Sequence, residues 1–130
     1  MTDLTFDLPK EQSSIIKVIG VGGGGSNAVN HMFNEGIVGV NFVVANTDAQ
    51  ALDISPIPNK VQLGPELTEG LGAGSDPEVG RVSCQESLED IREILSKNTK
   101  MAFITAGMGG GTGTGAAPVI AELAREMGIL

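Results

Sequence analysis

The sequence predicts an α/β domain in which helices flank a mainly parallel β-sheet. Three apolar runs, at residues 15–21, 40–45 and 101–105, have the length and the β-branched content of buried strands. Segments with helical periodicity separate these runs, and this alternation is typical of parallel sheets. The first and the third run each lead directly into a glycine-rich loop.

The first half of the chain contains one expected helix and two shorter elements besides its strands. The helix runs from residue 26 to about residue 35 and has its apolar positions on one face. These positions are Ala28, Val29, Met32 and Phe33. A helical turn is expected at residues 49–52, and the alternation at residues 61–63 predicts a short edge strand.

The second half contains two longer expected helices. Asp76 and Pro77 are typical of a helix start, and this helix is expected to reach about residue 97. The last helix is expected from about residue 114 to residue 127, with Pro118 tolerated in its first turn. Ile129 and Leu130 have the character of a further strand. We therefore expect an incomplete sheet, with a flexible arm at residues 1–14 and part of one domain at residues 15–130.

Composition excludes several classes of function. A chain of 130 residues forms one domain at most. Its net charge of −8 and the lack of a Lys/Arg cluster argue against a nucleic-acid partner. No apolar run approaches the ~18 residues of a membrane span, so direct membrane insertion is not expected. Cys84, the lone cysteine, has no partner for a disulfide and is expected to be a packing residue.

The two glycine loops, at residues 22–25 and 107–115, indicate a ligand with several phosphates. Right-handed crossovers would place both loops at the carboxyl edge of the sheet. Loops without side chains let backbone N–H groups approach a polyanion, and a helix N-terminus adds about half a positive charge. No lysine or arginine lies in either loop. The phosphate charge is therefore expected to meet N–H groups, helix dipoles and a divalent cation.

Several polar residues near the loops have two possible roles. Thr112 and Thr114 could donate to phosphate oxygens or simply cap the last helix. Asp48 could hold a cation through water or cap the turn that follows it. Ser26 and Asn27 could cap the first helix, bind phosphate or do both. The segment Gly72-Ala73-Gly74 is a third candidate phosphate loop.

A nicotinamide dinucleotide site is the alternative interpretation of the first loop. Residues 20–25 match the pattern G-x-G-x-x-G of Rossmann-like dinucleotide-binding domains. That pattern also requires an acidic residue at the end of the second strand to hold a ribose, whereas Asn46 ends that strand here. The second glycine loop is a further argument against an NAD-dependent oxidoreductase.

Four ordered segments resemble the FtsZ family of bacterial cell-division GTPases in the tubulin superfamily. These segments are residues 16–25, 46–52, 70–80 and 107–118, and the run GGGTGTG at residues 109–115 is similar to the signature loop of that family. The resemblance covers the chain from about residue 15 to its end. It implies a Rossmann-like, tubulin/FtsZ GTPase fold that binds GTP or GDP, with Mg²⁺.

The resemblance also assigns residues to the nucleotide. It implies that two loops wrap the phosphates, that Ala73 and Gly74 face the terminal phosphate, and that Asn46 and the metal-associated Asp48 lie near the phosphate and Mg²⁺. The two loops comprise Gly23, Gly24, Gly25, Ser26 and Asn27, and Gly109, Gly110, Gly111, Thr112 and Gly113. No catalytic residue is assigned, because the activating acids of the family belong to a later loop of the next subunit.

Partners and location follow from the same resemblance. It implies a cytoplasmic protein that polymerises head to tail at the midcell division ring, where membrane tethers and regulators bind it. Residues 1–130 lack the acidic loop and are not expected to hydrolyse GTP alone. A non-catalytic fragment that caps filaments is a further alternative.

Overall fold

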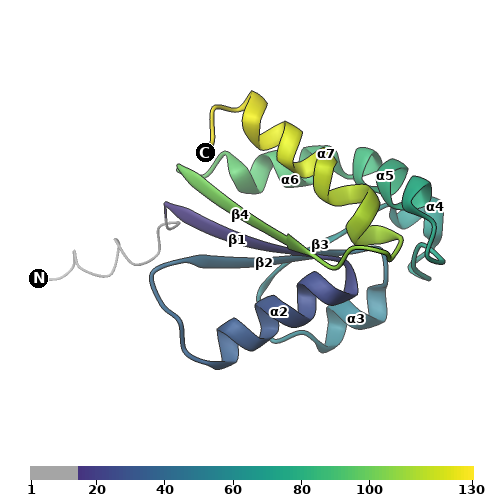
Figure 1. The fold of residues 1–130 in the computed structure, drawn as a ribbon, viewed down its shortest axis with the longest axis horizontal. Coiled ribbons are helices and arrows are strands. Elements are labelled where there is room, and N and C mark those ends of the chain that lie inside the picture. Colours follow the sequence, from purple (N-terminus) through teal and green to yellow (C-terminus); the bar gives the residue numbers. More distant parts are fainter. Residues whose placement is uncertain (1–14) are drawn as a thin grey trace, which may run out of the picture.

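The sheet has four parallel strands in the order β3-β2-β1-β4. We describe residues 15–130 of a computed structural model, and the arm expected at residues 1–14 lies outside the described residues. The strands are β1 (Ile16–Val21), β2 (Asn41–Asn46), β3 (Asn59–Gln62) and β4 (Met101–Ala106). Figure 1 shows β1 and β2 at the centre of the sheet. The predicted parallel α/β fold is confirmed, with β3 at one edge as expected.

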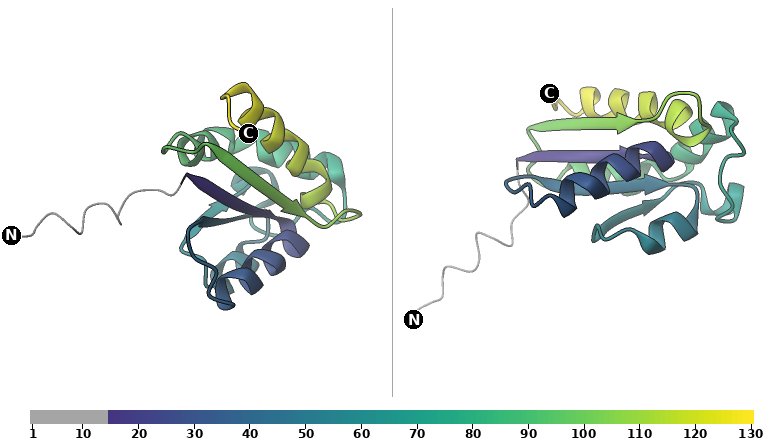
Figure 2. Two further views of the ribbon diagram at one scale, coloured as in Figure 1. Left: turned by 60° about the vertical axis from the view of Figure 1, so that its left-hand side comes forward. Right: turned by 60° about the horizontal axis from the view of Figure 1, so that its bottom comes forward.

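Helices cover both faces of this sheet (Figure 2). On one face lie α2 (Gly22–Asn34) and α3 (Ala49–Ile54). The other face carries α5 (Pro77–Glu86), α6 (Leu88–Leu95) and α7 (Thr112–Glu126), with the short α4 (Pro65–Thr68) beside α5. Successive residues of β1 enter opposite cores: Val18 packs with Val29 on the α2 side, and Ile19 packs with Ile120 on the α7 side. Burial on both faces explains why the strands are continuously apolar.

Helix α2 begins four residues earlier than expected. We expected a loop at residues 22–25 and a helix from residue 26, but α2 starts at Gly22, the residue at which the chain turns from β1 into the helix. Gly22 has φ of +75°, which glycine adopts without the steric penalty of a side chain. Ser26 and Asn27 are therefore in the second turn of α2, and the expectation that they cap the helix is wrong.

The helix expected from residue 77 to residue 97 is broken at Ser87 into α5 and α6. The Ser87 hydroxyl donates to the carbonyl of Gln62 at 3.1 Å and accepts from the N–H of Gly64 at 3.0 Å. The Ser87 main chain keeps helical hydrogen bonds, because its N–H donates to the carbonyl of Ser83 at 3.3 Å and its carbonyl accepts from the N–H of Ile91 at 3.4 Å. The two hydrogen bonds of the Ser87 hydroxyl connect the end of β3 to the junction of α5 and α6.

Helix α7 begins at Thr112, two residues earlier than expected, and its N-cap residue is Gly111. Neither Thr112 nor Thr114 caps it, so that interpretation is wrong. Pro118 lies inside α7 instead of in its first turn. The Pro118 side chain is exposed. Proline has no N–H to donate to the carbonyl four residues earlier, and solvent can hydrogen-bond to that carbonyl instead.

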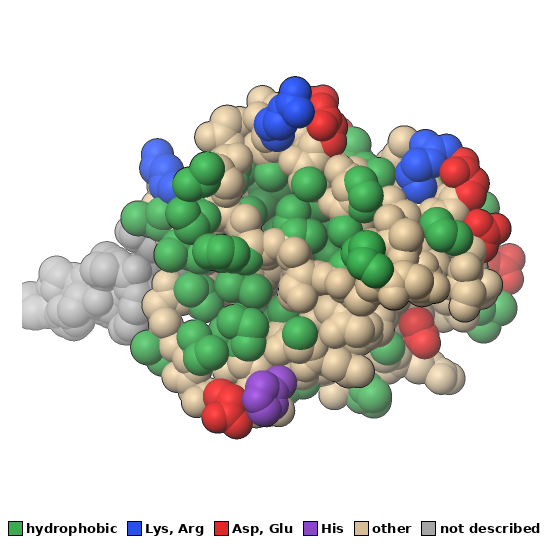
Figure 3. Space-filling model, viewed as in Figure 1, with side chains coloured by type: hydrophobic (Ala, Val, Ile, Leu, Met, Phe, Trp, Pro, Cys, Tyr) green, Lys and Arg blue, Asp and Glu red, His purple; other side chains and the backbone are tan. Residues whose placement is uncertain are grey.

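Strand β4 is less buried than expected, because its outer edge and part of one face are open. Phe103 in β4 is 55% exposed. It lines an apolar groove together with Ile16, Ala28, Met32 and Ile37, and Figure 3 shows the hydrophobic side chains gathered over β1, β4 and α2. Leu130 donates to the carbonyl of Lys100 at 3.1 Å and accepts from the N–H of Ala102 at 2.9 Å. These two bonds follow the pattern of a parallel ladder, but residues 129 and 130 are not assigned to a strand, so the further strand expected there stays a prediction.

Glycines bring the first turns of α5 and α7 into backbone contact. A Cβ on Gly115 would overlap the carbonyl oxygen of Pro77, and a Cβ on Gly80 would overlap that of Gly111. Neither side of these contacts is a flexible side chain that could move aside. The position of α7, and therefore of the loop before it, depends on these two glycines.

We expect Gly115→Ala to lower the free energy of unfolding by about 1–3 kcal/mol, because the added methyl group must displace the α5 backbone. Chemical denaturation of the full chain without nucleotide measures this change. Gly23→Ala is the matched control, since a Cβ there has no atom within 4 Å and Ala is the better helix former. Equal stability of the Gly115 variant and the wild type would contradict the packing account.

Candidate functional site

A pocket opens at the carboxyl edge of the sheet, where β1, β2 and β4 end. Three glycine-containing segments and the residues that follow β2 line it. Nine of the expected site residues are in its lining: Gly23, Gly24, Asn46, Asp48, Ala73, Gly110, Gly111, Thr112 and Gly113. Gly72 and Gly107, from the candidate loops at residues 72–74 and 107–115, also line the pocket. The lining residues that the sequence did not indicate are Val21, Thr47, Ala51 and Ser75. Parallel strand order is what brings these distant segments together.

Five expected site residues are not in the pocket lining. Gly25 packs beneath it, because a Cβ there would overlap the carbonyl of Thr105. Gly74 and Gly109 shape their loops with φ of +62° and +100°. Asn27 is exposed on α2, and Ser26 is buried with a hydroxyl that has no hydrogen-bond partner among the described residues.

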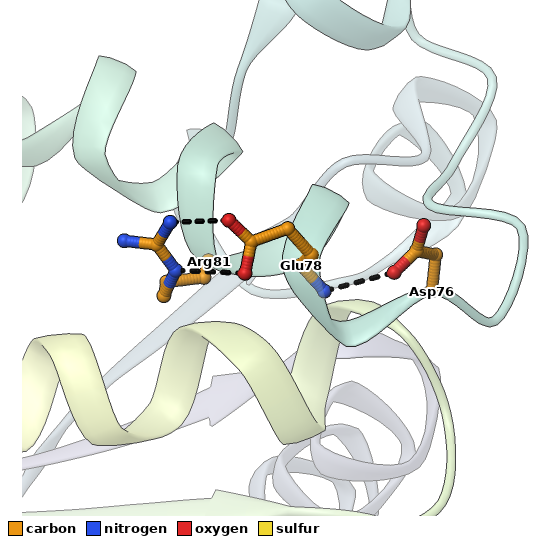
Figure 4. Close-up of polar contacts among 3 residues, drawn as sticks. All are labelled: Asp76, Glu78 and Arg81. Carbon is orange, nitrogen blue, oxygen red and sulfur yellow. Dashed lines mark hydrogen bonds and ion pairs between the residues drawn. The ribbon is translucent and has the colours of Figure 1, made fainter.

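Two of the helices that begin at the pocket, α2 and α7, have no side-chain cap, whereas α3 and α5 do. Neither Val21 before α2 nor Gly111 before α7 makes a side-chain cap hydrogen bond. In contrast, Asp48 caps α3, and Asp76 caps α5 by accepting from the N–H of Glu78 at 3.0 Å (Figure 4). The first N–H groups of a helix have no partner within the helix. The pocket therefore presents two sets of free donors, each with the positive end of a helix dipole.

Among residues 15–130, no lysine or arginine lines the pocket, and Asp48 is the only lining residue with a formal charge. Any anion bound there must be stabilised by main-chain N–H groups, helix dipoles and hydroxyl groups. A polyphosphate would bring several negative charges to a protein that already has a net charge of −8. A divalent cation bound with it would reduce that repulsion.

The glycines of the pocket fall into two groups. A Cβ on Gly23 or Gly110 would have no atom within 4 Å, so these glycines leave free space at the pocket wall. A Cβ on Gly111 would come within 2.7 Å of the N–H nitrogen of Asp76. Within one glycine-rich run, Gly110 thus leaves room for a ligand, while Gly111 and Gly115 leave room for α5.

Hydroxyl groups organise the loop before α7. Thr114 accepts a hydrogen bond from the N–H of Gly109 at 2.9 Å, which closes the loop over residues 109–114. The hydroxyls of Thr47 and Thr112 lie 2.7 Å apart and are hydrogen-bonded to each other. Thr47 escaped the sequence reasoning because a threonine between Asn46 and Asp48 has no motif of its own.

The structure shows one of the two roles expected of Asp48. One carboxylate oxygen accepts from the N–H groups of Gln50 at 2.9 Å and Ala51 at 3.2 Å, which is a helix cap. In the described part of the chain, no main-chain N–H group donates to the second carboxylate oxygen of Asp48. Residues 15–130 contain no cluster of three or more His, Cys, Asp or Glu side chains able to hold a metal ion. A cation here would need ligand oxygens and water beside Asp48.

Two other chemically reactive side chains lie apart from the pocket. His31 is exposed on α2 beside Glu35, as expected of a surface histidine. Burial raises the pKa of the Cys84 thiol to about 12, so Cys84 is a protonated packing residue in the α7-side core. Across the described part of the chain, no helix has the length and hydropathy needed to cross a membrane.

Comparison with known proteins agrees with this geometry. Residues 15–130 match the family model described as "Tubulin/FtsZ family, GTPase domain". The chain is 60% identical over 130 residues to the cell division protein FtsZ of Pseudomonas putida, covering 100% of this chain and 32% of that protein. It is 61% identical over 115 residues to FtsZ of Aquifex aeolicus, covering 88% of this chain and 31% of that protein.

Solved structures of the family have the same fold. An empty FtsZ dimer from M. jannaschii superposes with a TM-score of 0.86 at 42% identity, over 95% of this chain and 36% of that chain. A GDP-bound CetZ1 monomer from Haloferax volcanii gives a TM-score of 0.77 at 29% identity, over 86% of this chain and 38% of that chain. The chain thus spans about a third of the length of these relatives. The chain belongs to the Tubulin/FtsZ family, and residues 15–130 lie within its GTPase domain.

Proposed function

We propose that the pocket binds the phosphates of GTP and GDP and that the chain acts in a self-polymerising GTPase of the bacterial division ring. The observation that carries this proposal is the meeting of two uncapped helix N-termini, those of α2 and α7, in a pocket where the described residues place no cationic side chain. Such a pocket favours a ligand with several phosphates over a single carboxylate or sulfate. The match to the GTPase domain of the Tubulin/FtsZ family supports guanine as the base of the nucleotide.

The proposed contacts follow from position. Gly23 and Gly24 offer N–H groups from α2, Gly110 to Gly113 offer them from the α7 loop, and Ala73 faces the end of the phosphate chain. Asn46 and Asp48 lie at the end of β2 on the same pocket wall. Asp48 would hold Mg²⁺ through water, with phosphate oxygens completing the coordination. Gly25, Ser26, Asn27, Gly74 and Gly109 would contribute by shaping and supporting these segments.

Hydrolysis needs groups beyond the pocket lining. Attack of water on a phosphoryl group is accelerated by positioning and by electrostatic stabilisation. Asp48 is the one carboxylate in the lining, and it already caps α3. We infer that a second copy of the protein supplies the acid that positions the water, which would couple hydrolysis to head-to-tail polymerisation.

The rim of the pocket supports contact with a second copy. Leu71 and Met108, next in sequence to the lining residues Gly72 and Gly107, are 83% and 70% exposed. Ile54, which shares a second pocket with Asp48 and Ala51, is 84% exposed. Exposed apolar residues around a polar site are typical of an interaction surface. By family, this polymer would assemble in the cytoplasm at the midcell division ring, with membrane tethers and regulators as further partners.

Thermal unfolding of the full chain with Mg²⁺ and GTP, ATP or NAD⁺ in turn tests the ligand class. A ligand that binds only the folded state raises the melting temperature by mass action. We expect the largest rise with GTP. A rise with NAD⁺ alone would favour the dinucleotide interpretation instead, and the absence of any rise with GTP would contradict the proposal.

Gly110→Ala is expected to weaken GTP binding by at least about tenfold, because its methyl group would occupy the space that a phosphate needs against the loop. Stability without nucleotide should change by less than about 0.5 kcal/mol, since nothing lies within 4 Å of the new Cβ. Isothermal titration calorimetry and denaturation measure the two effects. Unchanged GTP affinity would sink the assignment of this loop.

Asp48→Asn separates the cation role from the capping role, because asparagine caps a helix as well as aspartate does. We expect the variant to bind GTP like the wild type in EDTA, but to be about fivefold weaker with Mg²⁺. Asp76→Asn, at the cap of α5 outside the pocket lining, is the matched control. If Asp48→Asn keeps the full enhancement by Mg²⁺, Asp48 has no part in cation binding.

A further inference from the structure

We propose that Thr47 is a positioning residue for nucleotide binding, holding the Thr112 hydroxyl so that it donates a hydrogen bond into the pocket. The inference rests on the proposed function, because the acceptor would be a phosphate oxygen of GTP. The two side chains come from segments 65 residues apart in sequence, and their hydroxyl oxygens are 2.7 Å apart. Both residues line the pocket.

The direction of this hydrogen bond follows from burial. Thr47 is 0% exposed, and Thr112 is 7% exposed. If Thr112 donated, the Thr47 hydrogen would be left in the interior without an acceptor, since Thr47 makes no second side-chain hydrogen bond among the described residues. A buried donor without a partner is costly. The favoured arrangement therefore has Thr47 donating to Thr112.

In this arrangement the remaining hydroxyl hydrogen belongs to Thr112. Thr112 is the first residue of α7, so its N–H is also one of the free donors at this helix terminus. A single residue can then offer a main-chain and a side-chain donor to one ligand. A hydroxyl that already accepts a hydrogen bond is a stronger donor, because hydrogen bonds in a chain polarise each other.

Thr47 is well placed to act as the fixed partner. The carbonyl of Asn46, just before it, accepts from the N–H of Leu63 at 2.8 Å, which anchors the end of β2 to the residue that follows β3. Asp48, just after it, caps α3. The Thr112 backbone is packed as well, since a Cβ on Gly80 would lie 2.9 Å from its Cα, so the bond from Thr47 fixes the orientation of the Thr112 hydroxyl.

Calorimetric titration of the full chain with Mg²⁺ and GTP tests this inference with two variants of one residue. Thr47→Val keeps the shape of the side chain and removes the hydroxyl, and we expect it to weaken binding about three- to tenfold. Thr47→Ser keeps the hydroxyl and should bind within about twofold of the wild type. Thr68→Val is the matched control, since that buried hydroxyl donates to the carbonyl of Gly64 outside the pocket lining.

A double-mutant cycle with Thr112→Val distinguishes positioning from a general structural role. If Thr47 acts through the Thr112 hydroxyl, Thr47→Val should cause no further loss of affinity once that hydroxyl is gone. The same fold-loss in both backgrounds, or wild-type affinity of Thr47→Val, would overturn the inference. Failure of the wild type itself to bind GTP would instead refute the proposed function, and the inference with it.

Discussion

The close backbone contact between the first turns of α2 and α7 is the constraint on which the rest of the structure depends. A Cβ on Gly22 would lie 2.8 Å from the N–H nitrogen of Gly113, and one on Gly24 would lie 3.2 Å from the Cα of Gly107. A side chain at Gly22 would push the two helix termini apart, and one at Gly24 would push α2 away from the loop that precedes α7. Since β1 and β4 are parallel neighbours, their following helices start at the same edge of the sheet, and glycine lets them start in contact.

This contact determines the chemistry of the pocket. Two helix termini in contact concentrate free N–H donors and partial positive charge in a small volume, with no lysine or arginine among the lining residues. Asp48 and Asp76 cap the neighbouring helices α3 and α5. The starts of α2 and α7, whose N–H groups a polyanion would need, have no side-chain cap. The glycines around the pocket differ in what their missing side chains allow. Gly23 and Gly110 leave space for a ligand, whereas Gly111 and Gly115 allow α5 to pack against α7.

The sequence predicted the fold and most of the pocket lining, because both depend on strong local patterns. Continuous apolar runs marked β1 and β2, and the glycine runs after β1 and β4 marked the pocket wall. Element boundaries were less accurate at the same glycines. A glycine run has no side-chain pattern to distinguish a loop from a first helical turn, so the starts of α2 and α7 were placed too late.

Other features depended on contacts between distant segments. The helix is broken at Ser87, where the hydroxyl reaches the end of β3, and nothing near Ser87 in the sequence indicates that partner. Thr47 was missed for the same reason, since its role arises from the hydroxyl of Thr112. The exposure of Phe103 depends on which elements lie beside β4, which the sequence of β4 alone does not determine.

The most direct measurement of the central claim is the response of individual amide groups to the ligand. In the ¹H–¹⁵N spectrum of the full chain, adding GTP with Mg²⁺ should shift the amide protons of Gly23, Gly24, Thr112 and Gly113 downfield and produce scalar couplings to ³¹P. Guanosine, which has no phosphate, should leave these amides unchanged. Saturating GTP binding without a response at these four amides would contradict the account, because the phosphates would then be held by other groups.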